Sequence, residues 1–517
     1  DRLAAGGAPE SMFRSEVDMA LHWWQTADSA PSENRRERTR VLRVLAEQAL
    51  IRAEPLEIKD QPAGAVNALI ASETLRNLGD DRVSFRHDVL REWAIGSLLH
   101  AEPERMGQLP LARPASAAHA RGVELAARMA IERSGDSKAW ESLLQRLSGA
   151  DVHGSWRRAA LLALTRSEVS SELLTRAADY LLRDRGALLR ELIRVVIAVE
   201  SEPATRLFAS IGMDPATIPK NLYVPSGPSW YRLIVWILSL GEQRPHAAIP
   251  DIVDLYTAWS SGTLGVDPLT PVLQAQLLRW LSEIETVRDN VSLKDLREPF
   301  GGEIDYDRIR SLESDIRSAF LLFASRTPQL AADYLRRLGS RRRSEDAIHG
   351  ILKFRGALAQ AAPAELAELT ANALIRKPDQ QDRWHRDEIE EPFEYVDHDF
   401  LPASPSQGPF LDLLTHSPQH GLALIRRLVD HAISFYCGGR EPGADAITVV
   451  FCDGDRSFPW QRSYYWSRDA NGNYSVTSAL MALEVWAHRR IEAGESFDSV
   501  LSDVLGPVGS PAAYLLI

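Results

Sequence analysis

The sequence predicts a mainly α-helical protein, in which a small domain of helices and short strands precedes a long array of helical pairs. Apolar residues recur at helical spacing through most of the 517 residues. Helix starts recur every ~15–25 residues between short Gly, Pro or Ser breaks, which is typical of stacked helical pairs. Near the N-terminus, the stretch from Val83 to Leu99 has the pattern of a short strand that turns directly into an amphipathic helix.

Composition and charge limit the functions that we expect. A hydrophobic content of 45% with 25% charged residues is typical of a soluble protein. The net charge of -12 argues against nucleic acid as a partner. Cys437 and Cys452 are too few for a disulfide framework, which indicates the cytoplasm. No apolar run reaches the ~18 residues of a membrane span, so we expect no membrane partner.

The N-terminal part has the pattern of one small domain. Helices are expected over residues 16–25, 35–50 and 64–78. Gly79 suits the end of the last helix, and Asp80-Asp81 suits a turn into a half-buried strand at Val83. The order helix, helix, strand, helix predicts a winged-helix-like domain over residues 35–105, after a helical segment at 1–34.

The next segment, residues 106–376, is predicted to be an α-solenoid of helical pairs. Internal similarity supports repeats, because the residues around positions 320, 328 and 338 are echoed around 410, 418 and 428, a constant offset of 90. The alternative is coincidence, since Ser or Thr followed by Pro is a common helix start.

The C-terminal part is predicted to contain a loop, a helical pair, a β insertion and further helices. The expected bounds are 377–409 for an acidic, Pro-rich loop, 410–440 for the helical pair, 441–476 for the β insertion and 477–517 for the C-terminal helices. The β-branched run AITVVFCD at 446–453 carries the strand prediction, and Asn471-Gly472 is a hairpin signal ahead of Tyr474 and Val476.

Aromatic residues gather in the predicted insertion. We predict that four of them bind a partner: Trp460, Tyr464, Tyr465 and Trp466. A small local core is the alternative interpretation.

Signatures of catalysis are absent from the sequence. It contains no G-x-x-x-x-G-K-[ST], no G-x-S-x-G, no H-E-x-x-H and no C-x-x-C. His and acidic residues between His385 and Asp399 could ligate a metal, but their spacing fits no known cage and a solvated loop explains them. We therefore predict no catalytic residue and no metal ligand.

Charged residues at two other places have competing interpretations. The arginines at 336, 337 and 341–343 either contact an anionic partner or decorate a helix C-terminus. His87 lies where the predicted strand becomes a helix, so it either contacts a neighbouring module or caps that helix. Asp88 is a good N-cap residue type.

The stretch FRHDVLREWAIGSLL (85–99), after its helical lead-in, resembles the C-terminal half of the winged-helix domain in STAND-class signalling NTPases. This class includes plant disease-resistance receptors (NLR proteins), apoptosome-type ATPases and bacterial antiviral STAND proteins. His87 and Asp88 match the last two residues of the family's Met-His-Asp motif, and Arg86 replaces the Met. The resemblance covers roughly residues 35–100.

The resemblance implies a role. In the family, the motif's histidine reaches the β-phosphate of ADP that is bound mainly by the preceding NTPase domain, so His87 and Asp88 become candidate cofactor-binding residues. ADP or ATP would be held by a domain upstream of Asp1, an ATPase, and this chain alone would bind no cofactor and catalyse nothing. The chain would hold the ATPase inactive until its helical array binds a protein ligand, for example a phage protein in antiviral defence, and activation would involve homo-oligomerisation.

Two other functions remain open on sequence grounds. A winged-helix regulator that binds DNA would need exposed arginines on its recognition helix, and only Arg76 lies in the predicted helix 64–78. A helical-repeat scaffold with no link to nucleotides is the second alternative.

Overall fold

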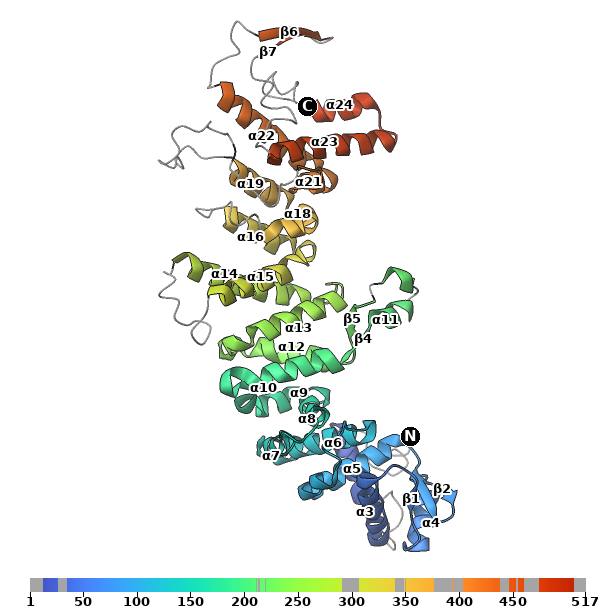
Figure 1. Ribbon diagram of the computed structural model, residues 1–517. Coiled ribbons are helices and arrows are strands. Elements are labelled where there is room, and N and C mark those ends of the chain that lie inside the picture. Colours follow the sequence, from blue (N-terminus) through green and yellow to red (C-terminus); the bar gives the residue numbers. More distant parts are fainter. Residues whose placement is uncertain are drawn as a thin grey trace. The chain divides into compact units, whose positions relative to one another are not determined.

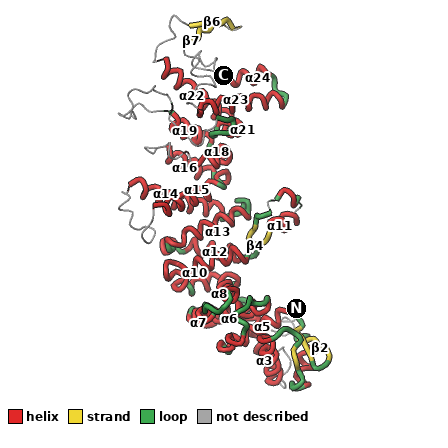
Figure 2. Tube along the Cα trace, in the orientation of Figure 1, coloured by secondary structure: helices red, strands yellow, loops and turns green. Residues whose placement is uncertain are grey.

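A computed structural model shows a mainly helical chain, as predicted (Figures 1 and 2). The structure describes residues 13–26, 35–210, 212, 214–218, 220–290, 306–339, 348, 350–375, 393, 403–437, 446–451, 454–459 and 474–505. The chain divides into two compact units. Unit 1 comprises residues 1–263 with 298–303, and unit 2 comprises 264–297 with 304–517.

Unit 1 begins with helices and three short strands. The elements are α2 (Glu16–Thr26), α3 (Arg35–Ile51), β1 (Leu56–Glu57), α4 (Ala63–Ala71), β2 (Leu75–Gly79), β3 (Arg82–Phe85) and α5 (Asp88–Ala101). The strands form an antiparallel sheet in the order β1-β3-β2, with Leu56 opposite Val83 and Leu75 opposite Phe85. The chain therefore passes from the central strand directly into α5, as predicted for this stretch.

The helix predicted over residues 64–78 is wrong in its second half. α4 ends at Ala71, and Glu73 has a positive φ of 56°, which a continuing helix does not allow. The residues that follow pair with β3 instead, and the positive φ values of Asp80 (49°) and Asp81 (53°) make the tight turn of a β-hairpin. The cross-strand hydrogen bonds of β2 replace those of the last predicted helical turns.

The expectation of a half-buried strand at Val83 is also wrong. Val83, Ser84 and Phe85 are all buried, although alternation predicts an exposed Ser84. Successive side chains of a strand point to opposite faces of the sheet, so both faces of β3 are covered at these residues.

Helix α5 packs very closely on α6 (Ala117–Ser134). The crossing is made by two glycines, Gly96 on α5 and Gly122 on α6. A Cβ atom on Gly96 would lie 2.9 Å from Leu125 Cβ, and one on Gly122 would lie 2.9 Å from Ile95 Cβ. The close approach makes the sheet-bearing part of unit 1 continuous with its later helices.

The rest of unit 1 is helical, and its helices contact one another in sequence (Figure 1). The elements are η3 (Pro103–Gln108), α7 (Lys138–Arg146), α8 (Gly154–Arg166), α9 (Ser170–Arg176), α10 (Ala178–Val199), α12 (Ser229–Ser239), η5 (Gly241–Gln243), η6 (His246–Ala248) and α13 (Ile249–Gly262). Helix α8 contacts α6, α7, α9, α10 and α12, so it is central to this part.

Helix α10 is kinked near its start. Arg183 is extended, and Asp184, Arg185 and Gly186 have φ values of 51°, 60° and 72°. The preceding helix α9 ends at Arg176, so the chain changes direction twice within about ten residues.

A small lobe interrupts the helices between α10 and α12. It contains β4 (Ser201–Pro203), α11 (Ala204–Ser210), η4 (Pro215–Thr217) and β5 (Tyr223–Pro225), none of which the sequence pattern predicts. The two strands pair antiparallel, with Ser201 opposite Pro225. The lobe has its own apolar cluster of Ala204, Phe208, Ile218 and Val224.

Unit 2 is also mainly helical, and it contains one β-hairpin before its last two helices. The elements are α14 (Thr270–Asn290), α15 (Tyr306–Leu321), η7 (Ala324–Arg326), α16 (Pro328–Gly339), η8 (Leu352–Phe354), α18 (Arg355–Ala361), α19 (Pro363–Leu374), α21 (Phe410–His416), α22 (Pro418–Cys437), β6 (Ala446–Phe451), β7 (Gly454–Pro459), α23 (Tyr474–Glu492) and α24 (Phe497–Leu505). Helices α16, α19 and α22 form one row of contacts, and η7, α18 and α21 form another.

The predicted helix starts at Pro328 and Pro418 are confirmed, since α16 and α22 begin there. The predicted β insertion contains an antiparallel hairpin, β6–β7, in which Phe451 lies opposite Gly454. Its predicted C-terminal end is wrong, because Tyr474 and Val476 belong to helix α23 and Val476 is buried. The helix follows the apolar periodicity through Val476, Ala479 and Leu483, and Asn471-Gly472 lies outside the described residues.

Candidate functional site

The junction between β3 and α5 carries the residues that the sequence singles out. His87 is the N-cap residue of α5, with extended backbone angles of −134° and 145°, and its side chain makes no capping hydrogen bond. Arg86 and His87 are exposed. The structure therefore does not support His87 as a side-chain cap, and its imidazole faces solvent at the start of a 14-residue helix.

The expected capping role of Asp88 is wrong. Asp88 is the first helical residue rather than the N-cap, and 83% of its side chain is exposed. Its carboxylate lies 3.5 Å from Arg91 one turn later, and Arg91 also lies 3.8 Å from Glu54. Since Glu54 accepts a hydrogen bond of 2.9 Å from the backbone of Phe85, these residues tie the end of β3 to the first turn of α5.

This junction has the chemistry of a weak anion contact. Backbone N–H groups at a helix N-terminus attract phosphates and carboxylates, and Arg86 and His87 add exposed donors. A single helix N-terminus and two side chains supply few contacts, so a second domain would have to provide the rest of a nucleotide site.

Helix α4 lacks the charges of a DNA-reading helix. Its nine residues, AGAVNALIA, include no Lys or Arg, and Arg76 lies on strand β2 instead. Recognition helices use Arg, Lys or Asn to read base edges and phosphates. Of these residue types α4 contains Asn67 alone, so the helix gives the DNA-binding alternative little support.

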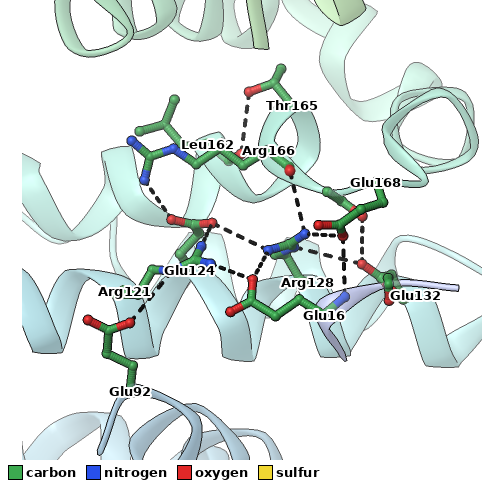
Figure 3. A network of polar contacts seen from close by, with 12 residues as sticks. Glu16, Glu92, Arg121, Glu124, Arg128, Glu132, Leu162, Thr165, Arg166 and Glu168 are labelled. Carbon is green, nitrogen blue, oxygen red and sulfur yellow. Dashed lines mark hydrogen bonds and ion pairs between the residues drawn. The ribbon is translucent and has the colours of Figure 1, made fainter. Parts of the chain in front are cut away.

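A second group of polar residues lies between α2, α6 and the end of α8 (Figure 3). We call it the Glu16 cluster and define it by Glu16, Glu124, Arg121, Arg128, Glu132, Arg166 and Glu168. Arg128 and Glu124 are 1% exposed, so these charges are removed from water. Charges so deeply buried need ion partners and hydrogen bonds to persist.

Glu16 enters this cluster from α2. Its Oε1 accepts a hydrogen bond of 3.0 Å from Trp93 Nε1 on α5. Its Oε2 accepts hydrogen bonds from Arg121 and, at 2.8 Å, from Arg128 Nη1, both on α6. One carboxylate thus joins three helices, and Figure 3 shows its contacts with Arg121 and Arg128.

The remaining charges extend the cluster toward the next helices. Glu124 Oε2 accepts a hydrogen bond of 2.7 Å from Arg166 at the end of α8. Arg166 Nε also donates to Glu200 at 2.8 Å, just after α10. The cluster therefore runs without interruption from α2 to the end of α10.

Burial and charge act differently on the carboxyl groups of this region. Burial raises the pKa of Glu92, which lies 3.9 Å from Arg121. Burial also raises the pKa of Glu132, despite hydrogen bonds from Ser15 and Ser167. For Glu16, burial would raise the pKa, but the hydrogen bond from Trp93 and the charges of Arg121 and Arg128 together lower it.

The sequence analysis missed the Glu16 cluster. A signal was present, because Arg121, Glu124, Arg128 and Glu132 follow one another at spacings of three and four residues, which places them on one helix face. Such a face is usually solvated, but α6 is buried almost throughout its length. Sequence alone does not reveal which charged face other helices cover.

Unit 2 contains a smaller cluster of similar chemistry. Arg337 lies 2.9 Å from the buried Glu285, and Arg317 bridges Glu285, Glu313 and Tyr334. Arg336 pairs with Asp333 at 2.8 Å. Arg336 and Arg337 are therefore engaged within unit 2, as expected for cations in a last helical turn, and the arginines at 341–343 lie outside the described residues.

Other predicted sites also lie outside the described residues. These are the partner-binding aromatics Trp460, Tyr464, Tyr465 and Trp466, and the acidic loop from His385 to Asp399 except Phe393. Among the described residues, no group of three or more His, Cys, Asp or Glu side chains is placed to hold a metal ion. In that part of the chain, no helix has the length and apolar character needed to cross a membrane.

Comparison with known proteins does not assign this chain to a family. A scan against protein-family models gives no match, and a search of curated proteins finds no significant similarity.

Proposed function

We propose that this chain is the regulatory and target-sensing region of a STAND-class NTPase, which holds an upstream ATPase domain inactive until a ligand binds. One observation carries the proposal. The elements α3-β1-α4-β2-β3, with the sheet order β1-β3-β2, lead directly into a helix that begins at an exposed Arg86-His87-Asp88. This sheet order supports a winged-helix-like domain, and the junction corresponds to the place where STAND-class proteins carry their nucleotide-sensing histidine.

The junction offers the chemistry that such a sensor needs. The imidazole of His87 is exposed beside the N–H groups of the first turn of α5, so it can donate to a phosphate that another domain holds. A charge-assisted hydrogen bond is worth about 1.5–3 kcal/mol. That energy shifts a two-state equilibrium by roughly ten- to a hundredfold, which is enough to favour a resting state. Asp88 faces solvent and would act through its pairing with Arg91.

The later helices suit a role in ligand capture. In unit 2, two rows of helices each contact their successors, and this arrangement supports an α-solenoid with an extended binding surface. We propose that a protein ligand, for example a phage protein, lies along this surface and reaches the aromatics from Trp460 to Trp466. Antiviral defence, the cytoplasmic location and homo-oligomerisation on activation belong to the same proposal.

The test is substitution of His87 in the protein that carries its NTPase domain. His87→Ala should raise basal activity roughly ten- to a hundredfold without a ligand, because it removes one contact that favours the resting state. A variant of the upstream phosphate-binding Lys should not raise activity, because it removes the nucleotide altogether. ATP turnover without ligand is the measurement.

His87→Ala should leave thermal unfolding almost unchanged, since the side chain is exposed and caps nothing. Unchanged basal activity in this stably folded variant would reduce His87 to a surface residue and would contradict the proposal.

A further inference from the structure

Helix α2 packs on unit 1 through a small apolar cluster of its own. Val17 and Ala20 are buried against Leu125 and Met129 of α6, and Leu21 of α2 and Trp93 of α5 pack at the edge of this group. The cluster combines residues of α2, α5 and α6 only, and it includes none of the residues of the three-stranded sheet. The 11-residue helix also buries Trp23, whose ring centroid lies 6.0 Å from that of Trp93, and α2 contacts α3 as well.

The first turn of α2 makes polar contacts with the same neighbours. Glu16 binds Trp93, Arg121 and Arg128 as described above. Ser15 donates a hydrogen bond of 2.6 Å to Glu132, and the backbone N–H of Glu16 donates to Glu168 at 3.3 Å. Helix α2 is thus oriented by a carboxylate at its start and by an apolar stripe behind it.

The charged groups around Glu16 have other partners within unit 1. Arg121 also binds Glu124, and Arg128 Nη2 also donates to Glu168 at 2.7 Å. Glu132 accepts a second hydrogen bond of 2.7 Å from Ser167. Removal of Glu16 would therefore leave each of these buried charges with an opposite charge or a donor, so it would avoid the large cost of an uncompensated ion.

We infer that α5, α6 and the segment after α8 form a receptor for an acidic amphipathic helix, which α2 fills as a displaceable latch. Arg121 and Arg128 of the receptor bind a carboxylate in the first turn of the bound helix. An apolar stripe of that helix, which in α2 consists of Val17, Ala20 and Trp23, packs against the receptor residues Leu125, Met129 and Trp93. A helix of the same chemistry from another molecule would compete with α2 for this surface. The inference does not depend on nucleotide binding.

Hydrogen exchange of the full chain tests the latch. Glu16→Gln keeps the size of the side chain but removes its charge, so exchange of the α2 amides should become about tenfold faster. Exchange in α6 and α8 should stay within about twofold of wild type, since their charges keep other partners. Glu172→Gln is the matched control, because it removes a carboxylate that pairs with Arg14 at an exposed position and should change α2 exchange little.

A peptide with the sequence of residues 13–26 tests the receptor. It should bind the full-length Glu16→Gln chain, in which the latch is weakened, at least tenfold more tightly than the wild-type chain, in which α2 occupies the surface. The same peptide with Gln at position 16 should bind neither chain. Fluorescence anisotropy of a labelled peptide gives both affinities.

Two results would overturn the inference. If Glu16→Gln leaves α2 exchange within twofold of wild type, the carboxylate does not hold the helix. If exchange in α2, α6 and α8 rises equally, α2 belongs to a single cooperative core and is no latch.

Discussion

Glu16 and Glu132 both lie beside Arg128, and yet their pKa values move in opposite directions. Arg128 Nη1 donates to Glu16 at 2.8 Å, whereas its Nε lies 3.9 Å from Glu132. Burial is the largest influence on both groups, but only Glu16 receives enough hydrogen bonds and positive charge to overcome it. The geometry around Arg128 thus decides which of the two carboxyl groups is stabilised in its ionised form.

This contrast predicts opposite effects of two substitutions on the stability of unit 1. The lowered pKa of Glu16 means that its stabilising contribution is complete above its unfolded pKa and is lost as the pH falls through its folded pKa. Glu16→Gln should therefore weaken the docking of α2 within unit 1 by about 1–2 kcal/mol at pH 7, and by less in acid.

For Glu132, the raised pKa means that its favourable contribution is present at low pH and is lost as the pH rises through the folded value. Glu132→Gln should therefore be neutral or stabilising at pH 7, and its advantage should vanish below the unfolded pKa. Exchange of the α2 amides measures the Glu16→Gln variant and urea unfolding measures the Glu132→Gln variant, each at pH 7 and pH 4. Equal destabilisation by the two substitutions at pH 7 would contradict the assignment.

At the residue scale, sequence located His87 but not its role in the helix. The position of His87 between strand and helix follows from local periodicity, which the sequence carries. Asp88 would cap the helix if α5 began at residue 89, but the helix begins at residue 88 and His87 is the N-cap. Local patterns do not fix a helix start to a single position. The partners of Glu16 are 77 or more positions away, beyond the reach of local patterns.

At the element scale, the crossing of α5 and α6 depends on the two glycines. Gly122→Ala should destabilise unit 1 by about 1–3 kcal/mol, because the added Cβ would overlap Ile95 and force the helices apart. Gly64→Ala in α4 is the control. Nothing lies within 4 Å of its added Cβ, so it should stabilise that helix by about 0.5–1 kcal/mol.

Chemical unfolding of both glycine variants measures the difference. A Gly122→Ala variant as stable as Gly64→Ala would show that the two helices can separate at little cost.

Element types were predictable where one periodicity dominated, as in α3, α12 and α22. They were not predictable where two signals competed. The segment 75–78 continues an apolar pattern compatible with a helix, but its backbone pairs with β3, a long-range contact that outweighs local preference. Tyr474 and Val476, which were expected in a strand, instead begin helix α23.

At the scale of the whole molecule, the helices contact mainly their neighbours in sequence. A chain cut after Gly339, at the end of α16, should therefore keep unit 1 and helices α14–α16 folded. A cut after Arg183 should be more damaging, because it divides α10 and removes Glu200, whose carboxylate binds Arg166. Circular dichroism and hydrogen exchange of the two fragments measure the retained structure.

Loss of helical signal throughout the longer fragment would indicate a single closed core instead of a repeat array. The division of the chain at 263 and 264 falls within the array predicted over 106–376. The sequence shows no change of pattern there, because helical pairs have similar periodicity on both sides.

The lobe between α10 and α12 has a practical consequence. Its first and last strands pair side by side, so the chain leaves the helices and returns to them at points about 5 Å apart. An insertion whose ends meet so closely can be exchanged for another folded module of the same end spacing without stretching the helices on either side. A fluorescent protein or an affinity handle placed at this position would report on unit 1 while both chain ends remain unmodified.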